Sequence, residues 1–257
     1  MKGFKNIALA GALLLSVALP AAALAETAKP VVAKNVVLVH GAWADGSCWD
    51  DVIARLQAAG LHVTSVQNPL TSLKDAADAT KRVLAQQDGP TVLVGHSWSG
   101  TLISETGTDP KVTALVYVAA RAPDAGEDFV ALSGKFPTTP ARAGVENHDG
   151  FTTLTEDAYL KYFAGDIPAP RARVLFATQQ PTAASLFADK TDAAAWHDKP
   201  SFYAVSTQDQ TIAPELEKFL AKRMNATTIE LPASHLSMIS HPKEIADLIL
   251  QAAGRTK

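Results

Sequence analysis

Apolar and polar positions along the chain follow two alternating patterns. Short apolar runs, typical of buried parallel strands, are separated by longer segments with apolar positions at helical spacing. The runs predict strands at residues 36–39, 61–66, 91–94, 112–118, 201–206 and 226–231. The longer segments predict helices at residues 49–59, 73–87, 98–107, 212–223 and 242–253. This alternation predicts an α/β fold with a mostly parallel central sheet flanked by helices on both faces.

Residues 121–199 interrupt the alternation, because about 80 residues separate two predicted strands, far more than an ordinary connection. The segment contains six prolines and six of the nine phenylalanines of the chain. Exposing so many aromatic side chains in an unstructured loop would be unfavourable in water. We therefore predict a helical cap at about 121–199, inserted before the last two strands. It covers the carboxyl edge of the sheet, where ligands bind in open α/β folds. The sequence does not show which aromatic side chains face a ligand and which only pack on the core.

The N-terminal segment predicts export. Lysines precede an apolar run at 7–19, which is short for a membrane span, and small residues at 23–25 match a signal-peptidase site. We expect residues 1–25 to be a signal peptide and the mature chain to begin at Glu26, as a periplasmic or secreted protein. The alternative is a permanent N-terminal anchor, but no stop-transfer pattern follows. Residues 26–257 have the length of a single domain.

Composition excludes several kinds of partner. The net charge is −3 and basic residues do not cluster, so the chain lacks the electrostatic footprint of a nucleic-acid-binding protein. No segment of the mature chain predicts membrane binding. The single cysteine, Cys48, has no partner for an internal disulfide, and we interpret it as a small buried residue rather than a nucleophile. The oligomeric state is not predicted.

Candidate chemistry begins at residues 95–100, Gly-His-Ser-Trp-Ser-Gly, directly after the apolar run at 91–94. Small residues two positions before and after Ser97 permit a tight strand-to-helix turn that exposes the serine hydroxyl. Ser97 is therefore a candidate nucleophile, although a glycine- and serine-rich loop is also common in parallel-sheet proteins.

A serine nucleophile requires a general base and a carboxylate that orients the base. Asp209 follows the predicted strand at 201–206, and His235 follows the predicted strand at 226–231. The order Ser97, Asp209, His235 is that of an α/β-hydrolase triad. Asp124, after an earlier strand, is the alternative acid.

Two backbone N–H groups must also stabilise the developing oxyanion. One is expected from Trp98, the residue after the candidate nucleophile, and the second from Ala42, in the loop after the first strand. Three other residues of that loop, His40, Gly41 and Trp43, are expected to bind substrate. The tryptophans are open to two interpretations, a wall of the substrate site or core packing.

With these motifs, the chain resembles the α/β-hydrolase superfamily. Within the superfamily it is similar to the compact group that includes plant methylesterases, hydroxynitrile lyases and bacterial esterases. The motifs that carry the resemblance are LVHGAW at 38–43, GHSWSG at 95–100, TQDQTI at 207–212 and ASH at 233–235. The resemblance covers almost all of the mature chain, and implies a mostly parallel sheet with a helical cap and no cofactor or metal.

The chain departs from the family pattern at two positions. Ser99 replaces the last glycine of the G-x-S-x-G motif. Leu236 follows the candidate base, where the resemblance to hydroxynitrile lyases would require a lysine, so cyanohydrin cleavage is disfavoured. Ser97 itself disfavours the haloalkane dehalogenases and epoxide hydrolases of the superfamily, which use an aspartate nucleophile.

The sequence therefore predicts a serine hydrolase that cleaves small to medium, apolar or aryl carboxylic esters through an acyl-enzyme. The same residues would serve a lactonase, thioesterase, amidase or perhydrolase. A binding protein on a hydrolase scaffold, which would hold a small ligand without turnover, is the alternative of another class.

Overall fold

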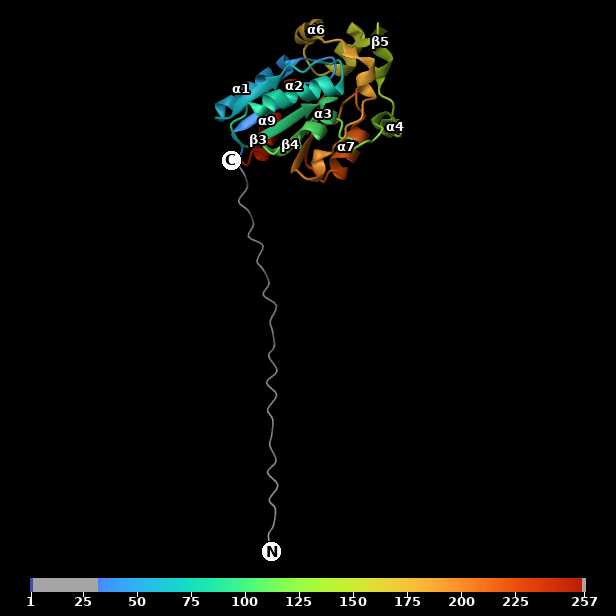
Figure 1. Cartoon of the computed structure of the whole chain (residues 1–257). Helices are drawn as coiled ribbons and strands as arrows, with labels where there is room; N and C mark the ends of the chain where they lie inside the picture. Colours follow the sequence, from blue (N-terminus) through green and yellow to red (C-terminus); the bar gives the residue numbers. More distant parts are fainter. Residues whose placement is uncertain (2–31, 256–257) are drawn as a thin grey trace. The chain divides into compact units, whose positions relative to one another are not determined.

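A computed structural model of the chain describes Met1 and residues 32–255. A six-stranded sheet with the order β2-β1-β3-β4-β8-β9 lies at its centre, and every neighbouring pair of strands is parallel (Figure 1). The predicted parallel sheet is therefore confirmed. The strands are β1 (Asn35–Val39), β2 (His62–Val66), β3 (Thr91–His96), β4 (Val112–Val118), β8 (Ser201–Ser206) and β9 (Thr227–Leu231).

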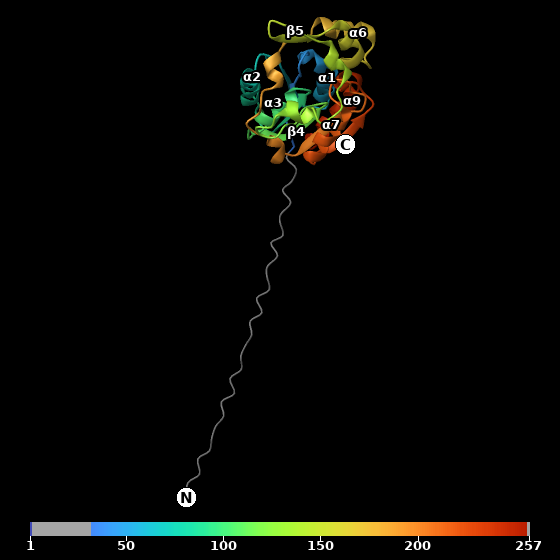
Figure 2. The ribbon, with the colours of Figure 1, turned by 90° about the vertical axis from the view of Figure 1, so that its right-hand side faces the viewer.

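Helices cover both faces of this sheet. The chain passes from β1 through α1 outward to β2 and returns through α2 to β3, so right-handed crossovers place α1 and α2 on opposite faces. Figure 2 shows α1 and α9 on one side of the strands and α2 and α3 on the other. The helices are α1 (Asp50–Ala58), α2 (Leu73–Ala85), α3 (Ser99–Thr106), α7 (Pro214–Arg223), the short α8 (Ser237–Ser240) and α9 (Pro242–Ala252).

The strand and helix boundaries have local causes. All five residues of β1 and all six of β3 are buried, which explains why these strands appear as unbroken apolar runs. The Ser72 side chain caps the start of α2 by accepting a hydrogen bond from Asp75 N, and proline occupies the first turn of both α7 and α9. A 3-10 turn, η1 (Gly46–Trp49), precedes α1 where the sequence predicts helix from residue 49.

The cap connects β4 to β8 and differs in one respect from the predicted helical cap. It contains helices and also a three-stranded antiparallel sheet with the order β5-β6-β7. Asp149 and Gly150 both have positive φ, as a tight hairpin turn between β5 and β6 requires. The elements are α4 (Phe129–Ser133), η2 (Pro140–Gly144), β5 (Val145–His148), β6 (Phe151–Leu154), α5 (Glu156–Ala158), η3 (Tyr159–Phe163), α6 (Ala169–Ala177), β7 (Thr182–Ala183), η4 (Ala184–Phe187) and η5 (Ala195–His197).

Within residues 32–255, no helix is both long and apolar enough to cross a membrane. The predicted signal peptide, Met1 excepted, lies outside the described residues.

Candidate active site

Ser97 lies on a sharp turn between β3 and α3. Its φ angle is +56°, a conformation that is strained for a residue with a side chain. Ser97 N–H donates to the carbonyl of Val118 at 3.1 Å, and this bond ties the turn to the end of β4. Gly100 lets the start of α3 pack closely against the segment after β4, because a Cβ atom there would lie 1.7 Å from the carbonyl oxygen of Arg121.

Hydrogen bonds connect the three predicted catalytic side chains. His235 Nε2 lies 2.8 Å from Ser97 Oγ, and His235 Nδ1 lies 2.5 Å from Asp209 Oδ2. His235 is fully buried, whereas Ser97 keeps 7% of its surface exposed. With Nδ1–H directed at the carboxylate, Nε2 is the free base that can accept a proton from the serine hydroxyl.

The loop after β8 holds Asp209 in place. Its Oδ1 atom accepts hydrogen bonds from the backbone N–H groups of Thr211, at 2.6 Å, and Ile212, at 3.0 Å. Both carboxylate oxygens are therefore used, one by the loop and one by the histidine. The alternative acid, Asp124, instead contacts His197 Nε2 at 3.1 Å near the surface.

A second buried histidine, His96, lies against His235. The His96 ring centroid is 4.7 Å from that of His235, and His96 Nε2 lies 3.1 Å from the His235 carbonyl oxygen. Burial and the neighbouring His235 hold the pKa of His96 well below its usual value. His96 is therefore neutral, and it donates from Nε2 to position the backbone of His235.

His40 and Gly41 do not line the cavity beside Ser97, which differs from the expected substrate contact. The His40 ring is fully buried and its Nδ1 lies 3.0 Å from the carbonyl oxygen of Gly41, within its own loop. Burial also lowers the pKa of His40. Gly41 has a steric role, because a Cβ atom there would lie 2.7 Å from Ser97 Cβ.

Ala42 and Trp98 flank Ser97, and all three residues line one cavity. Within the described part of the chain, neither the Ala42 nor the Trp98 backbone N–H donates to a protein acceptor. Free N–H groups beside a nucleophile can bind an oxyanion.

Contacts with the cap hold both tryptophan rings. Trp43 Nε1 donates to Thr152 Oγ1 in β6 at 3.2 Å, and Trp98 Nε1 donates to the Leu186 carbonyl in η4 at 3.1 Å. Trp43, with φ +56°, also donates its backbone N–H to Thr182 Oγ1 in β7 at 3.2 Å. Both residues line the cavity as well. The rings thus form cavity wall and also connect the cap to the sheet.

The cavity beside Ser97 has a volume of about 490 Å³, which is within the usual range for small-molecule sites. Its wall combines the turn of Ser97 between β3 and α3, here called the elbow, and the Ala42–Trp43 loop with cap residues, including Phe129, Phe136 and Phe187. Among the residues that the structure describes, no group of histidine, cysteine and carboxylate side chains has the arrangement of a metal site.

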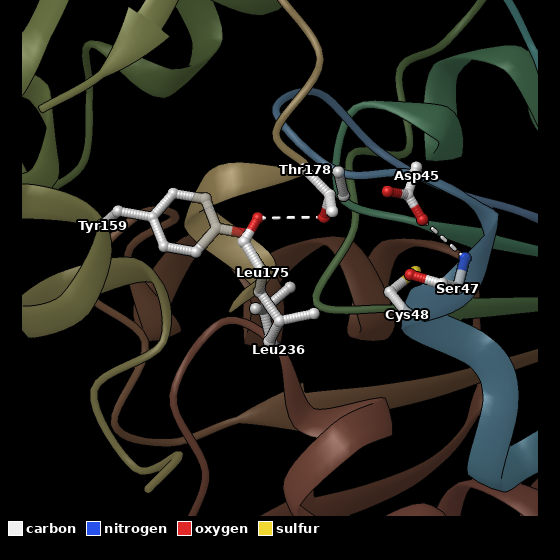
Figure 3. A pocket seen from close by; sticks show the side chains of 8 residues that line it. Asp45, Ser47, Cys48, Tyr159, Leu175, Thr178 and Leu236 are labelled. Atoms are coloured by element: carbon white, nitrogen blue, oxygen red, sulfur yellow. Dashed lines mark hydrogen bonds between the residues drawn. The ribbon is translucent and has the colours of Figure 1, made fainter. Parts of the chain in front are cut away.

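Cys48 lines a different, much smaller cavity of about 10 Å³, enough for a single water molecule at most. Figure 3 shows Cys48 beside Ser47 and Asp45, with Tyr159 and Leu175 across the cavity. Burial, with the charges of Asp45 and other acids, raises the pKa of the thiol well above its usual value. The prediction that Cys48 is a buried residue is confirmed.

The sequence did not point to Glu217, a fully buried residue of α7 beside Asp209. Ser206 N–H donates to Glu217 Oε2 at 3.0 Å. Burial and the negative charge of Asp209 raise the pKa of Glu217 well above its usual value. A polar residue on an otherwise apolar helix face was the available signal, but helical spacing alone does not reveal a tertiary neighbour.

A serine at a strained strand-to-helix turn of a parallel sheet is typical of α/β hydrolases. The model of the alpha/beta hydrolase family matches residues 36–248, so the chain belongs to this family. This confirms the resemblance seen in the sequence.

The relatives include bacterial and plant proteins. A carbendazim hydrolyzing esterase of Nocardioides is 30% identical over 139 residues, which are 49% of this chain and 57% of the esterase. Salicylic acid-binding protein 2 of Nicotiana tabacum is 26% identical over 255 residues, 86% of this chain and 97% of that protein. The crystal structure of a pyrethroid hydrolase from Sphingobium faniae has a TM-score of 0.73 at 21% identity, and the match covers 86% of this chain and 97% of that one.

Proposed function

We propose that the chain is a serine hydrolase of small to medium carboxylic esters. The observation that carries the proposal is the continuous hydrogen-bond chain from Ser97 Oγ through His235 to Asp209. The names of relatives support the same class of reaction, because they include a carbendazim hydrolyzing esterase and a pyrethroid hydrolase.

The proposed reaction begins when Ser97 Oγ attacks the ester carbonyl carbon and His235 Nε2 accepts the hydroxyl proton. The carbonyl π electrons move to oxygen, and the N–H groups of Ala42 and Trp98 donate to this oxyanion. Asp209 stabilises the imidazolium. The intermediate then collapses, the bond to the alcohol oxygen breaks, and His235 returns the proton to the leaving alcohol.

The acyl-enzyme is removed by the same groups. His235 takes a proton from a water molecule, whose oxygen attacks the acyl carbon. The second tetrahedral intermediate expels Ser97 Oγ, which recovers its proton from His235. The products are a carboxylic acid and an alcohol, and the enzyme is regenerated without a cofactor. The aromatic wall of the cavity suits apolar or aryl substituents.

The test is the Ser97→Ala variant, assayed with short 4-nitrophenyl esters. We expect kcat to fall by a factor on the order of 10⁴–10⁶. Ser240→Ala, a serine that does not line the cavity, is the matched control and should keep full turnover. Wild-type turnover by purified Ser97→Ala would refute the proposal.

A fluorophosphonate probe separates an enzyme from a binding protein on the same scaffold. The proposal predicts stoichiometric labelling of Ser97 in the folded wild-type protein and none in Ser97→Ala. An unlabelled wild-type protein that binds small ligands would instead be a binding protein. A panel of lactones, thioesters, amides and peracid-forming reactions then ranks the alternatives that share this chemistry.

A further inference from the structure

The cavity beside Ser97 carries positive charge without a matching acid. Arg121 and Arg142 are part of its wall, and no aspartate or glutamate is among the described residues that line it. The whole chain has a net charge of −3, so the excess of positive charge is a local property of the cavity. Arg142 is exposed and marks the outer part of the wall, whereas Arg121 is partly buried.

The Arg121 guanidinium has no carboxylate partner among the described residues. Its one hydrogen bond to protein runs from Nη1 to the carbonyl of Phe187, at 3.0 Å. The guanidinium carbon lies over two rings, 4.9 Å from the centroid of Phe129 and 5.3 Å from that of Phe187. These contacts fix its position and leave most of its five N–H donors unused.

Arg121 remains a cation in this environment. Burial lowers its pKa to about 10, which keeps the guanidinium protonated at neutral pH. An unpaired charge in a largely apolar wall is costly, so it is rarely retained without a function. A planar guanidinium with free N–H groups matches the geometry of a carboxylate, which it can bind through two parallel hydrogen bonds.

Arg121 is also close to the reacting centre. Its backbone N–H donates to the carbonyl of Ser97 at 2.9 Å, so its side chain starts at the elbow and extends along the cavity wall. A carboxylate bound there would share this cavity with an ester carbonyl at Ser97.

We propose that the substrate is an ester that also bears a carboxylate, which Arg121 binds while Ser97 attacks the ester group. This inference rests on the proposed function. It narrows the substrate class to esters that are otherwise apolar and carry one anionic group, in either the acid or the alcohol part. Arg142 contributes attraction at the outer part of the cavity.

The experiment compares matched pairs of anionic and neutral substrates. For the acid part, the 4-nitrophenyl monoester of adipic acid, whose chain is too long for rapid closure to the cyclic anhydride, is compared with 4-nitrophenyl hexanoate. For the alcohol part, 4-acetoxybenzoate is compared with 4-methylphenyl acetate. We expect wild-type kcat/KM to favour the anionic member of at least one pair by roughly 10–100-fold, the worth of a charged hydrogen-bonded contact.

Variants assign the preference to a residue. Arg121→Met should bring the kcat/KM ratio of the anionic to the neutral member close to one, mainly by raising KM for the anionic member. Arg121→Lys should keep part of the preference for the anionic member, since lysine keeps the positive charge but lacks the planar guanidinium that can form two parallel hydrogen bonds. Arg173→Met is the matched control, because Arg173 is an exposed arginine of the cap that does not line the cavity.

Two results would overturn the inference: no anionic preference in either pair, or an anionic preference that survives Arg121→Met, as it would if both members of a pair lost the same factor in kcat/KM. If Arg121→Met does not fold, competitive inhibition of the wild type decides. Glutarate or benzoate should inhibit more strongly than its amide, and added salt should weaken the inhibition. Equal inhibition by acid and amide would refute the inference. If Ser97→Ala loses all turnover but the wild type prefers the neutral member of each pair, the proposed function stands and only this inference is rejected.

Discussion

At the scale of single residues, the departure of the elbow from the family motif has a structural consequence. The Ser99 hydroxyl donates to the carbonyl of His40, in the loop that supplies the Ala42 N–H group. A glycine at this position could not make that bond. The side chain that breaks the motif therefore connects the turn of Ser97 to the loop of Ala42, and the proposed mechanism places both around the same carbonyl.

Glu217 gives a prediction for the dependence of stability on pH. Its pKa is raised in the folded state by burial and by Asp209, whereas in the unfolded chain it has the ordinary value of about 4.3. Below that pH, Glu217 is protonated in both states and does not lower the free energy of unfolding. As pH rises, the unfolded chain ionises first, so the free energy of unfolding falls until the folded pKa is reached.

Glu217→Gln removes this loss and keeps an acceptor for Ser206 N–H. We expect the variant to match the wild type near pH 4 and to become more stable toward pH 8, by about 1.4 kcal/mol for each unit of raised pKa. Urea unfolding across this range measures the difference. Glu215→Gln, an exposed neighbour on α7, should show no such trend. A constant difference between Glu217→Gln and the wild type would contradict the prediction.

At the scale of elements, the cap supports the loop of Ala42 and Trp43, the loop proposed to supply an oxyanion donor, and does not only cover the cavity. Strands β6 and β7 accept hydrogen bonds from Trp43, the residue after Ala42. Trp43 has a positive φ angle that is unfavourable for a bulky side chain, so these bonds hold a strained backbone. The position of the Ala42 N–H group therefore depends on the cap.

Thr182→Val tests this dependence, because it keeps the shape of the side chain and removes the acceptor of Trp43 N–H. We expect kcat to fall about 3–30-fold with little change in KM, less than the loss of an oxyanion donor itself. An unsatisfied buried N–H should also cost about 1–3 kcal/mol of stability. Thr228→Val, on exposed β9, is the control. Lower stability with unchanged kcat would show that the bond is structural only.

The cap is also where sequence patterns were least informative. The inner strands β1, β3, β4 and β8 are buried runs whose apolar character is visible locally, whereas the edge strands β2 and β9 are largely exposed. The ends of all six strands are predicted to within two residues. The hairpin β5–β6 has few buried residues, and its main signal is the Asp149-Gly150 pair, which favours a tight turn. Proline content indicated short pieces but not whether they were helices or strands.

At the scale of the whole molecule, the sequence was sufficient to predict candidate site residues that directly follow a strand. Ser97, Asp209 and His235 each follow a strand, and a parallel sheet places such positions at one edge. Arg121 also follows a strand, but nothing local shows that its guanidinium lacks an acid partner. Which groups contact the guanidinium depends on the fold of the cap, which brings Phe187 to Arg121 from 66 positions along the sequence and places Phe129 beneath the guanidinium.

Export is a prediction about the whole chain that the sequence alone carries. We propose that residues 1–25 are removed and that the mature protein is periplasmic or secreted. When the full chain is expressed in a bacterium, N-terminal sequencing of the exported protein should begin at Glu26. Ala25→Phe places a bulky residue at the cleavage site, so it should yield a precursor longer by 25 residues that stays with the membrane fraction. Activity confined to the cytoplasm, in a chain that still begins at Met1, would disprove the proposal.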